Sequence, residues 1–492
     1  METRASPGRN WVRFVAAAVI AAAVAIGIFR LISPAATLEV QLEDRIRIAF
    51  SDPASGQDAR ISLVTVDEAT MATLPYRSPV DRGLLAHVVA ILNAAGARAV
   101  GLDILLDQPT EPEKDARLAD ALRSFAGDAV LAWADARAGM TEAQSAWLTG
   151  FLDAAGATAG FVNLRHDADG VVRRHIVALT GTDLPSFSEA LAGGGGRLDP
   201  VGRIDWRLPQ SNGAPVFQET PAHVLPLMAA NPQILRTWFE GRIVLVGASL
   251  PQQDRHPTPV STILGTMQTT GLHIHAQVIA QLLDQRQLPE LAAWQRIGYI
   301  FAMAAIASAL ASLPLALAMR VCLLSGVVAL HLGCIYLVFD TTGLILPVAT
   351  ALTAILLSAA GSLGVDAVLA HKGRRYVRQA FGHYLAPELV DHLVRNPGDL
   401  RLGGERRRMT FLFTDLAGFT SMSERMEAEK IAELLNSYLD GVSEIIMRHN
   451  GVIDKFIGDA VVALFGVPQD DPAHAARALA CAAEIDEFAE RF

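Results

Sequence analysis

Cysteine is scarce in this chain, which has only three among 492 residues. Cys322 and Cys334 lie in an apolar run and Cys481 lies in a helical stretch, so neither a disulfide framework nor a Cys/His zinc spacing is present. An excess of basic residues is missing too: the chain has 41 Lys and Arg and 51 Asp and Glu, which gives a net charge of −10. That balance lacks the electrostatic footprint of a nucleic-acid-binding protein, so we expect no nucleic-acid partner.

Charged residues make up only 19% of the chain, whereas hydrophobic residues make up 51% and the mean hydropathy is +0.31. Membrane spans must therefore be sought first. Residues 11–32 are almost wholly apolar and long enough to cross a bilayer as a helix. A cleaved signal peptide is the alternative, but the run exceeds the roughly 7–15 apolar residues of such signals, which favours an uncleaved anchor.

A second apolar block occupies residues 295–368. It is interrupted at Arg320 and around Asp340, which divides it into three runs that each approach spanning length. These runs cover approximately 297–317, 321–339 and 344–365. The sequence therefore predicts four transmembrane helices.

The basic residues predict how the chain is oriented. They occur in residues 1–10, at Arg320 and directly after the last span, whereas the turn at Asp340 has none. Basic loops stay on the cytoplasmic side, so we expect residues 1–10, 369–403 and 404–492 inside and residues 33–294 outside. The basic cluster after the last span would interact with anionic lipid.

The outer segment has the pattern of an α/β domain with a parallel or mixed sheet. Its clearest strands are 61–66, 99–106 and 242–246, and a helix is expected over 82–94. Asp67 and Asp103 fall at or near strand ends, where open α/β sheets commonly bind ligands. Capping of the following segment is the alternative role for both.

Two carboxylates mark the candidate site near the end of the chain. Asp415 ends a predicted strand over 408–415, and Asp459 follows 44 residues later in a Gly458-Asp459 dipeptide that predicts a hairpin. A sheet can bring both turns together, and two carboxylates beside a triphosphate suit two hard cations. Taken singly, each is better explained as a helix cap or a hairpin turn.

Several strings in the outer segment closely resemble the second type of CHASE extracellular sensor domain. They are 64–68, 95–103, 241–248 and 271–276. The resemblance covers roughly residues 35–290 and implies reception of an unknown extracytoplasmic ligand. Its usual order, one span before the sensor and three after, agrees with the hydropathy pattern.

The strings 413–420 and 454–460 resemble the class III nucleotidyl cyclase catalytic domain, and 381–388 resembles the segment that leads into it. The resemblance implies an incomplete α+β, ferredoxin-like cyclase domain at 404–492 behind a helical connector at 369–403. It implies a homodimer in the bacterial inner membrane, with a periplasmic sensor, that converts ATP to 3′,5′-cyclic AMP and pyrophosphate.

The same resemblance assigns roles to individual residues. Asp415 and Asp459, joined by the Leu416 carbonyl, would bind two divalent cations, Mg²⁺ or Mn²⁺. Lys455 would read adenine, because a lysine donates to adenine N1 but clashes with the N1–H of guanine. Substrate would also contact Ala417, Gly418, Phe419, Thr420 and Gly458.

The family's catalytic domain continues well past the point reached at residue 492. The Asn and Arg that steady the transition state are therefore expected beyond it, and we expect this chain to be part of a longer reading frame. The alternative is a non-catalytic receptor whose cyclase-like half only dimerises or binds nucleotide.

Overall fold

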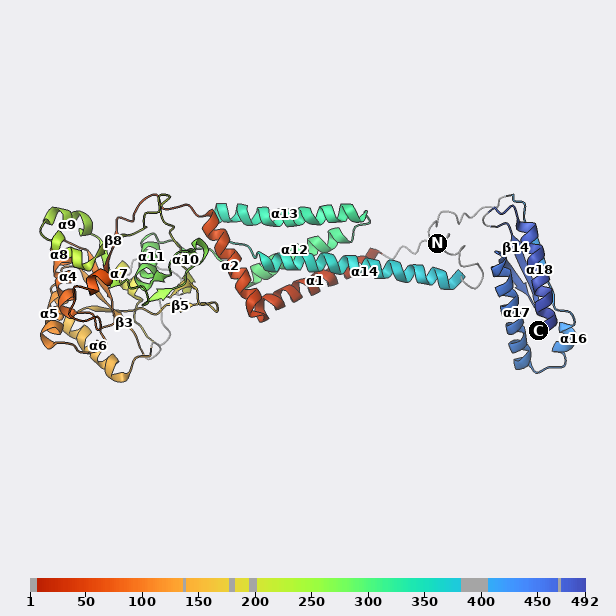
Figure 1. The fold of residues 1–492 in the computed structure, drawn as a ribbon, viewed down its shortest axis with the longest axis horizontal. Coiled ribbons are helices and arrows are strands. Elements are labelled where there is room, and N and C mark those ends of the chain that lie inside the picture. Colours follow the sequence, from red (N-terminus) through yellow and green to blue (C-terminus); the bar gives the residue numbers. More distant parts are fainter. Residues whose placement is uncertain (1–6, 136–138, 177–181, 194–200, 382–405, 468–469) are drawn as a thin grey trace. The chain divides into compact units, whose positions relative to one another are not determined.

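The computed structural model describes residues 7–135, 139–176, 182–193, 201–381, 406–467 and 470–492 (Figure 1). They form two compact units, Met1–Ser362 and Leu363–Phe492. The first unit contains the predicted sensor and most of the membrane helices, and the second contains the candidate site. Most of the predicted connector, including the string 382–388, lies outside the described residues, as do residues 1–6 of the predicted cytoplasmic N-terminus.

The sensor is built on a six-stranded sheet in the order β4-β3-β2-β9-β1-β8, and every neighbouring pair is parallel. All six residues of β1 are buried, as expected for a strand covered on both faces. The three predicted strands are present, although the second ends at Asp103 rather than at residue 106. The strands are β1 (Ile61–Val66), β2 (Ala99–Asp103), β3 (Asp128–Trp133), β4 (Thr158–Phe161), β8 (Gln218–Pro221) and β9 (Ile243–Ala248).

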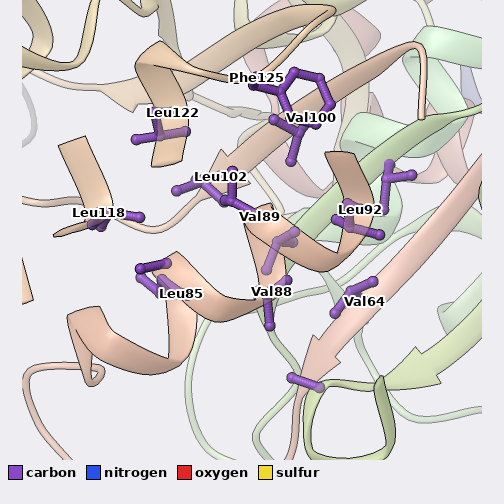
Figure 2. Packing of buried hydrophobic residues seen from close by; sticks show 14 of the residues in the cluster. Val64, Leu85, Val88, Val89, Leu92, Val100, Leu102, Leu118, Leu122 and Phe125 are labelled. Atoms are coloured by element: carbon purple, nitrogen blue, oxygen red, sulfur yellow. The ribbon is translucent and has the colours of Figure 1, made fainter. Parts of the chain in front are cut away.

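Helices cover both faces of this sheet. One face packs against α4 (Arg82–Ala94), α5 (Pro112–Arg123), α6 (Glu142–Ala155) and α9 (Pro232–Phe239). Figure 2 shows Leu85, Val88, Val89 and Leu92 of α4 gathered beside the β2 side chains of this core. The other face packs against α7 (Phe187–Ala192) and α11 (Gly271–Leu283). The α4 bounds match the predicted helix over 82–94.

Smaller elements surround this three-layer core. An antiparallel sheet contains β5 (Arg165–His166), β6 (Val172–Ile176) and β7 (Val201–Arg203), and a short pair contains β10 (Arg255–His256) and β11 (Thr269–Thr270). The short helices are α3 (Glu68–Met71), a 3₁₀ turn η2 (Ala222–Val224), α8 (Leu225–Met228) and α10 (Pro259–Leu264). The β5-β6-β7 sheet contacts a helix outside the sensor core, Ser33–Phe50.

Three helices are long and apolar enough to cross a membrane within the described part of the chain: Phe14–Leu31, Leu317–Thr342 and Ala349–Leu369. The fourth predicted span corresponds to α12, whose first turn carries Gln295 and Arg296 and lowers its apolar content. The predicted count of four is thus not reached by length and composition. The helices are α1 (Pro7–Leu31), α2 (Ser33–Phe50), α12 (Ala293–Ala311), α13 (Leu317–Thr342) and α14 (Ala349–Phe381).

The predicted break at Arg320 is wrong by several residues. Because proline cannot continue a helix, the chain leaves α12 just before Pro314, and Arg320 lies inside the first turn of α13. Its guanidinium donates to the carbonyls of Ala311 and Leu315 at 3.0 and 2.9 Å, which supplies partners to the end of α12. The break after α13 falls at Gly343, close to its predicted place.

The second unit contains a three-stranded antiparallel sheet in the order β12-β14-β13. Two long helices pack on one face through a core that includes Tyr438, Val442, Ile446, Cys481 and Ile485. On the other face Phe411, Phe413 and Ile457 are exposed. The elements are β12 (Thr410–Thr414), α16 (Phe419–Ser423), α17 (Ala428–Arg448), β13 (Val452–Ile457), β14 (Ala460–Phe465) and α18 (His474–Arg491).

Candidate active site

The two predicted metal-binding aspartates lie at one edge of the β12-β14-β13 sheet. Asp415 directly follows β12 and Asp459 directly precedes β14, and the two strands pair with Thr414 opposite Val461. The backbone N–H of Leu416 donates to Asp459 Oδ2 at 3.2 Å, and the N–H of Val461 donates to Thr414 Oγ1 at 3.2 Å. Direct hydrogen bonds therefore link the end of β12 and the turn after it to the hairpin that contains Asp459, as expected from the predicted strand and hairpin.

Tyr438 lies beneath this edge and was not predicted from the sequence. Its side chain comes from α17 and is 2% exposed. Burial raises the pKa of Tyr438, a hydrogen bond with Thr414 opposes that rise, and the Asp459 and Asp415 carboxylates add to it. A buried phenol thus lies within electrostatic reach of both carboxylates. A polar tip on an otherwise apolar helix face is the signal that would have identified it.

The segment after Asp415 forms a tight turn rather than a strand. The Leu416 carbonyl accepts from Phe419 N–H at 3.1 Å, so one of its lone pairs is already used within the turn. Gly418 has a φ of +82°, the left-handed region that glycine occupies without a steric penalty, and α16 begins after it. Ala417, Gly418 and Thr420 are exposed and Phe419 is half-buried, so this segment is open to a ligand.

Gly458 and Asp459 form the predicted two-residue hairpin between β13 and β14. Gly458 has a φ of +67°, which explains the need for glycine at this turn. Lys455 lies further along β13, and its side chain is 59% exposed with Nζ 3.2 Å from the Asp454 carboxylate. Both Lys455 and Phe413 pair with Val462, so the three share the sheet face that the helices leave open.

The donor set fits a hard divalent cation. Carboxylate oxygens are the ligands that Mg²⁺ and Mn²⁺ prefer, and such ions keep positions for water and substrate phosphates. Asp415 is exposed, and Asp459 is partly exposed with Oδ2 engaged by one N–H. No group of three or more His, Cys, Asp or Glu side chains within the described residues has the spacing of a metal site. The carboxylate ligands would therefore come from these two aspartates.

The two predicted sensor residues have different roles. Asp67 caps α3, accepting from Thr70 N–H at 2.8 Å and Thr70 Oγ1 at 2.7 Å, which matches the alternative reading. Asp103 ends β2 and is half-buried. Burial raises its pKa to about 8, and the nearby Asp254 carboxylate adds to this shift. Asp103 is thus the stronger ligand candidate of the two.

Comparison with known proteins identifies both parts of the chain. Residues 17–312 match the CHASE2 domain and residues 404–492 match the adenylate and guanylate cyclase catalytic domain. Adenylate cyclase 1 of Rhizobium meliloti (strain 1021) is 35% identical over 115 residues, which are 23% of this chain and 17% of that protein. The adenylate cyclase of Anabaena cylindrica is 41% identical over 103 residues, 21% of this chain and 19% of that protein. This chain therefore spans less than a fifth of the length of either relative.

Two crystal structures also match in part. The adenylyl cyclase CyaB from P. aeruginosa is 38% identical, covering 17% of this chain and 43% of that chain with a TM-score of 0.17. The guanylyl cyclase Cya2 is 42% identical, covering 18% and 45% with a TM-score of 0.18. At these TM-scores no structural argument rests on the likeness.

Proposed function

Because this chain belongs to the family of adenylate and guanylate cyclases that carry a CHASE2 sensor domain, we propose that it is a sensor-controlled adenylate cyclase. The substrate is ATP, and the products are 3′,5′-cyclic AMP and pyrophosphate. The observation that carries the proposal is the hydrogen bond from Leu416 to Asp459, which sets the two aspartates at one sheet edge. The names of the adenylate cyclases matched over this region support it.

Each residue of the site has a proposed task. Asp415 and Asp459 hold two divalent cations, Mg²⁺ or Mn²⁺, with the free side of the Leu416 carbonyl. Such cations, when bound, neutralise phosphate charge and lower the pKa of the attacking ribose 3′-hydroxyl. The exposed turn Ala417–Thr420 and Gly458 receive the triphosphate. Lys455 donates to adenine N1 on the open sheet face, which favours ATP over GTP.

We place the protein in a bacterial inner membrane with the sensor in the periplasm and the catalytic lobe in the cytoplasm. The proposal keeps four crossings, with α12 as the fourth: its Ile300 and Ala304 pack with Ala18 and Ala22 of α1 in one apolar cluster. Ser308 of α12 also donates to the Phe14 carbonyl at 3.0 Å. A helix packed this closely on a span would share its membrane environment. The proposed order is 1–10 inside, 11–32 as first span, 33–294 outside, 295–368 as three spans, then 369–403 and 404–492 inside.

The active protein is proposed to be a homodimer, in which each copy completes the site of the other. Phe411 and Phe413 stack on the open face of the sheet and are 57% and 69% exposed. Ile457 is also exposed, at 59%. Large exposed apolar side chains that adjoin one another are typical of surfaces that a partner covers. An unidentified ligand in the periplasm would control the dimer through the sensor.

Cyclic AMP formation tests this proposal. Membranes containing the 492-residue chain, and the chain extended by any further residues of its reading frame, would be incubated with ATP and Mn²⁺. Asp415→Ala and Asp459→Ala would each abolish activity, and Asp440→Ala, which changes an exposed aspartate on α17, would keep it. Silence of the extended protein would overturn the proposal in favour of a non-catalytic receptor that only dimerises or binds nucleotide.

A further inference from the structure

Helix α2 carries four charged side chains that are almost completely buried. Glu39, Glu43, Asp44 and Arg47 are between 3% and 8% exposed, although α2 is only 18 residues long. The spacing of these residues places them along one side of the helix. Burying a charge is costly unless it is paired or hydrogen-bonded, so the partners of this stripe show what α2 holds together.

At one end of the stripe, Glu39 holds the start of α14. Its carboxylate accepts the backbone N–H of Val348 at 2.6 Å, the N–H of Thr350 at 2.7 Å and the Thr350 hydroxyl at 2.7 Å. The first N–H groups of a helix have no partner within the helix and carry its positive dipole end. Glu39 therefore caps α14 from a helix more than 300 residues away in sequence.

At the other end of the stripe, α2 forms ion pairs with the β5-β6-β7 sheet of the sensor. Asp44 accepts from Arg173 Nε at 2.7 Å, and Glu43 pairs with Arg203. Arg173 is 3% exposed and is also held by Asp167 at 3.0 Å and by Asp169 at 2.7 Å. Both arginines belong to this small sheet, on β6 and β7. A displacement of the sheet must carry α2 with it or leave buried charges without partners.

We propose that α2 is a lever, a helix that transmits movement of the sensor to α14. The Asp44–Arg173 ion pair attaches α2 to the sensor, and Glu39 is the positioning residue at the start of α14. This inference rests on the proposed function, because α14 is one continuous helix from Ala349 to Phe381 whose chain leads on to the catalytic lobe. Figure 1 shows α2 between the sensor and the membrane helices of the first unit. A network of packed, paired charges that has two discrete arrangements can couple the conformations of two distant parts of a protein.

Hydrogen–deuterium exchange of the full chain in lipid nanodiscs tests the lever without any cyclase assay. Glu39→Ala removes the acceptor of the Val348 and Thr350 amides, which should then exchange at least tenfold faster. Glu39→Gln retains an acceptor oxygen and should give a smaller increase. If Glu39→Ala leaves these amides unchanged, Glu39 does not position α14 and the proposal fails.

A second variant tests transmission along α2. Asp44→Asn weakens the ion pair with Arg173. It should accelerate exchange of the Val348 and Thr350 amides at least threefold, although residue 44 contacts neither amide. The matched control is Asp115→Asn, which disturbs the buried Arg82–Asp115 pair elsewhere in the sensor and should leave these amides unchanged. Unaltered exchange of the β1 amides would show that each variant remains folded.

Two further results would overturn the proposed role of α2. Asp44→Asn without effect at Val348 and Thr350 would reduce Glu39 to a static cap. An equal effect of Asp115→Asn would mean general loosening of the sensor rather than a route through α2. Because no nucleotide is present, neither result depends on whether the catalytic lobe makes cyclic AMP.

Discussion

The backbone N–H of Leu416 donates a hydrogen bond of 3.2 Å to Asp459 Oδ2, although the two residues are 43 positions apart in sequence. The bond closes the turn after β12 onto the hairpin before β14. A carboxylate held by a backbone N–H is oriented before any ligand arrives, which lowers the cost of assembling a cation site. Asp459 thus has both a structural and a proposed metal-binding role.

Substitutions at Asp459 should separate these two roles. Asp459→Asn keeps an oxygen that can accept from Leu416 but loses the negative charge, whereas Asp459→Ala loses both. We expect both variants to weaken Mn²⁺-dependent binding of a fluorescent ATP analogue at least tenfold, and only Asp459→Ala to accelerate amide exchange at Leu416. Retention of binding by Asp459→Asn would contradict the proposed cation site.

Tyr438 provides a second test of the same edge. Tyr438→Phe removes the hydroxyl near Thr414 while preserving the ring, so the free energy of unfolding of the lobe should fall by no more than about 1.5 kcal/mol. Tyr438→Ala opens a cavity in the core and should cost about 3–5 kcal/mol. We expect Tyr438→Phe to weaken Mn²⁺-dependent nucleotide binding severalfold, through displacement of Thr414. Equal binding by wild type and Tyr438→Phe would make the phenol a core residue only.

The local features of this lobe could be predicted from the sequence because they depend on neighbouring residues. Gly458-Asp459 indicated the hairpin, and the run 408–415 indicated β12. The polar tip of Tyr438 on an apolar helix face indicates a buried polar partner, but the sequence does not identify Thr414 as that partner, because the two residues come together only in the folded lobe. The break between α12 and α13 was misplaced because Arg320 was treated as a boundary, whereas Pro314 sets it.

The charged stripe of α2 shows a second limit of the sequence. Glu39, Asp44 and Arg47 resemble a solvated helix face, since most charged residues are exposed. Their partners lie 129 residues away for Asp44 and 311 for the Glu39–Thr350 contact, so no local pattern identifies them. The α/β class of the sensor, in contrast, followed from its buried strands and intervening helices.

The stability of the sensor should depend on pH through Asp103. Its pKa is raised from the ordinary 3.8 to about 8 in the folded chain, mainly by burial. Between about pH 4 and pH 8 the folded chain keeps a proton that the unfolded chain releases. Stability therefore falls as pH rises through this window, by at most about 1.4 kcal/mol per pH unit, and is independent of this group above it.

Asp103→Asn removes this titration. The melting temperature of the variant should exceed that of wild type by an amount that grows from pH 4.5 to pH 8, as measured by differential scanning fluorimetry in detergent. Asp67→Asn is the control for loss of a carboxylate beside another strand of the same sheet, because asparagine also caps a helix. A melting-temperature curve of Asp103→Asn that runs parallel to that of wild type would contradict the raised pKa of Asp103.

Base selection should depend on Lys455, whose side chain is 59% exposed on the face that it shares with Phe413. Adenine offers an acceptor at N1 and guanine a donor, so replacing the ammonium by a carboxylate exchanges the favoured partner. Lys455→Glu should lower affinity for ATP at least tenfold and shift the ATP-to-GTP affinity ratio toward GTP, measured by competition against a fluorescent nucleotide with Mn²⁺. Asp454→Asn removes the neighbouring carboxylate 3.2 Å from Lys455 Nζ and should leave the ratio unchanged. A ratio that is the same in Lys455→Glu and wild type would exclude Lys455 from base reading and leave the choice between ATP and GTP to other residues.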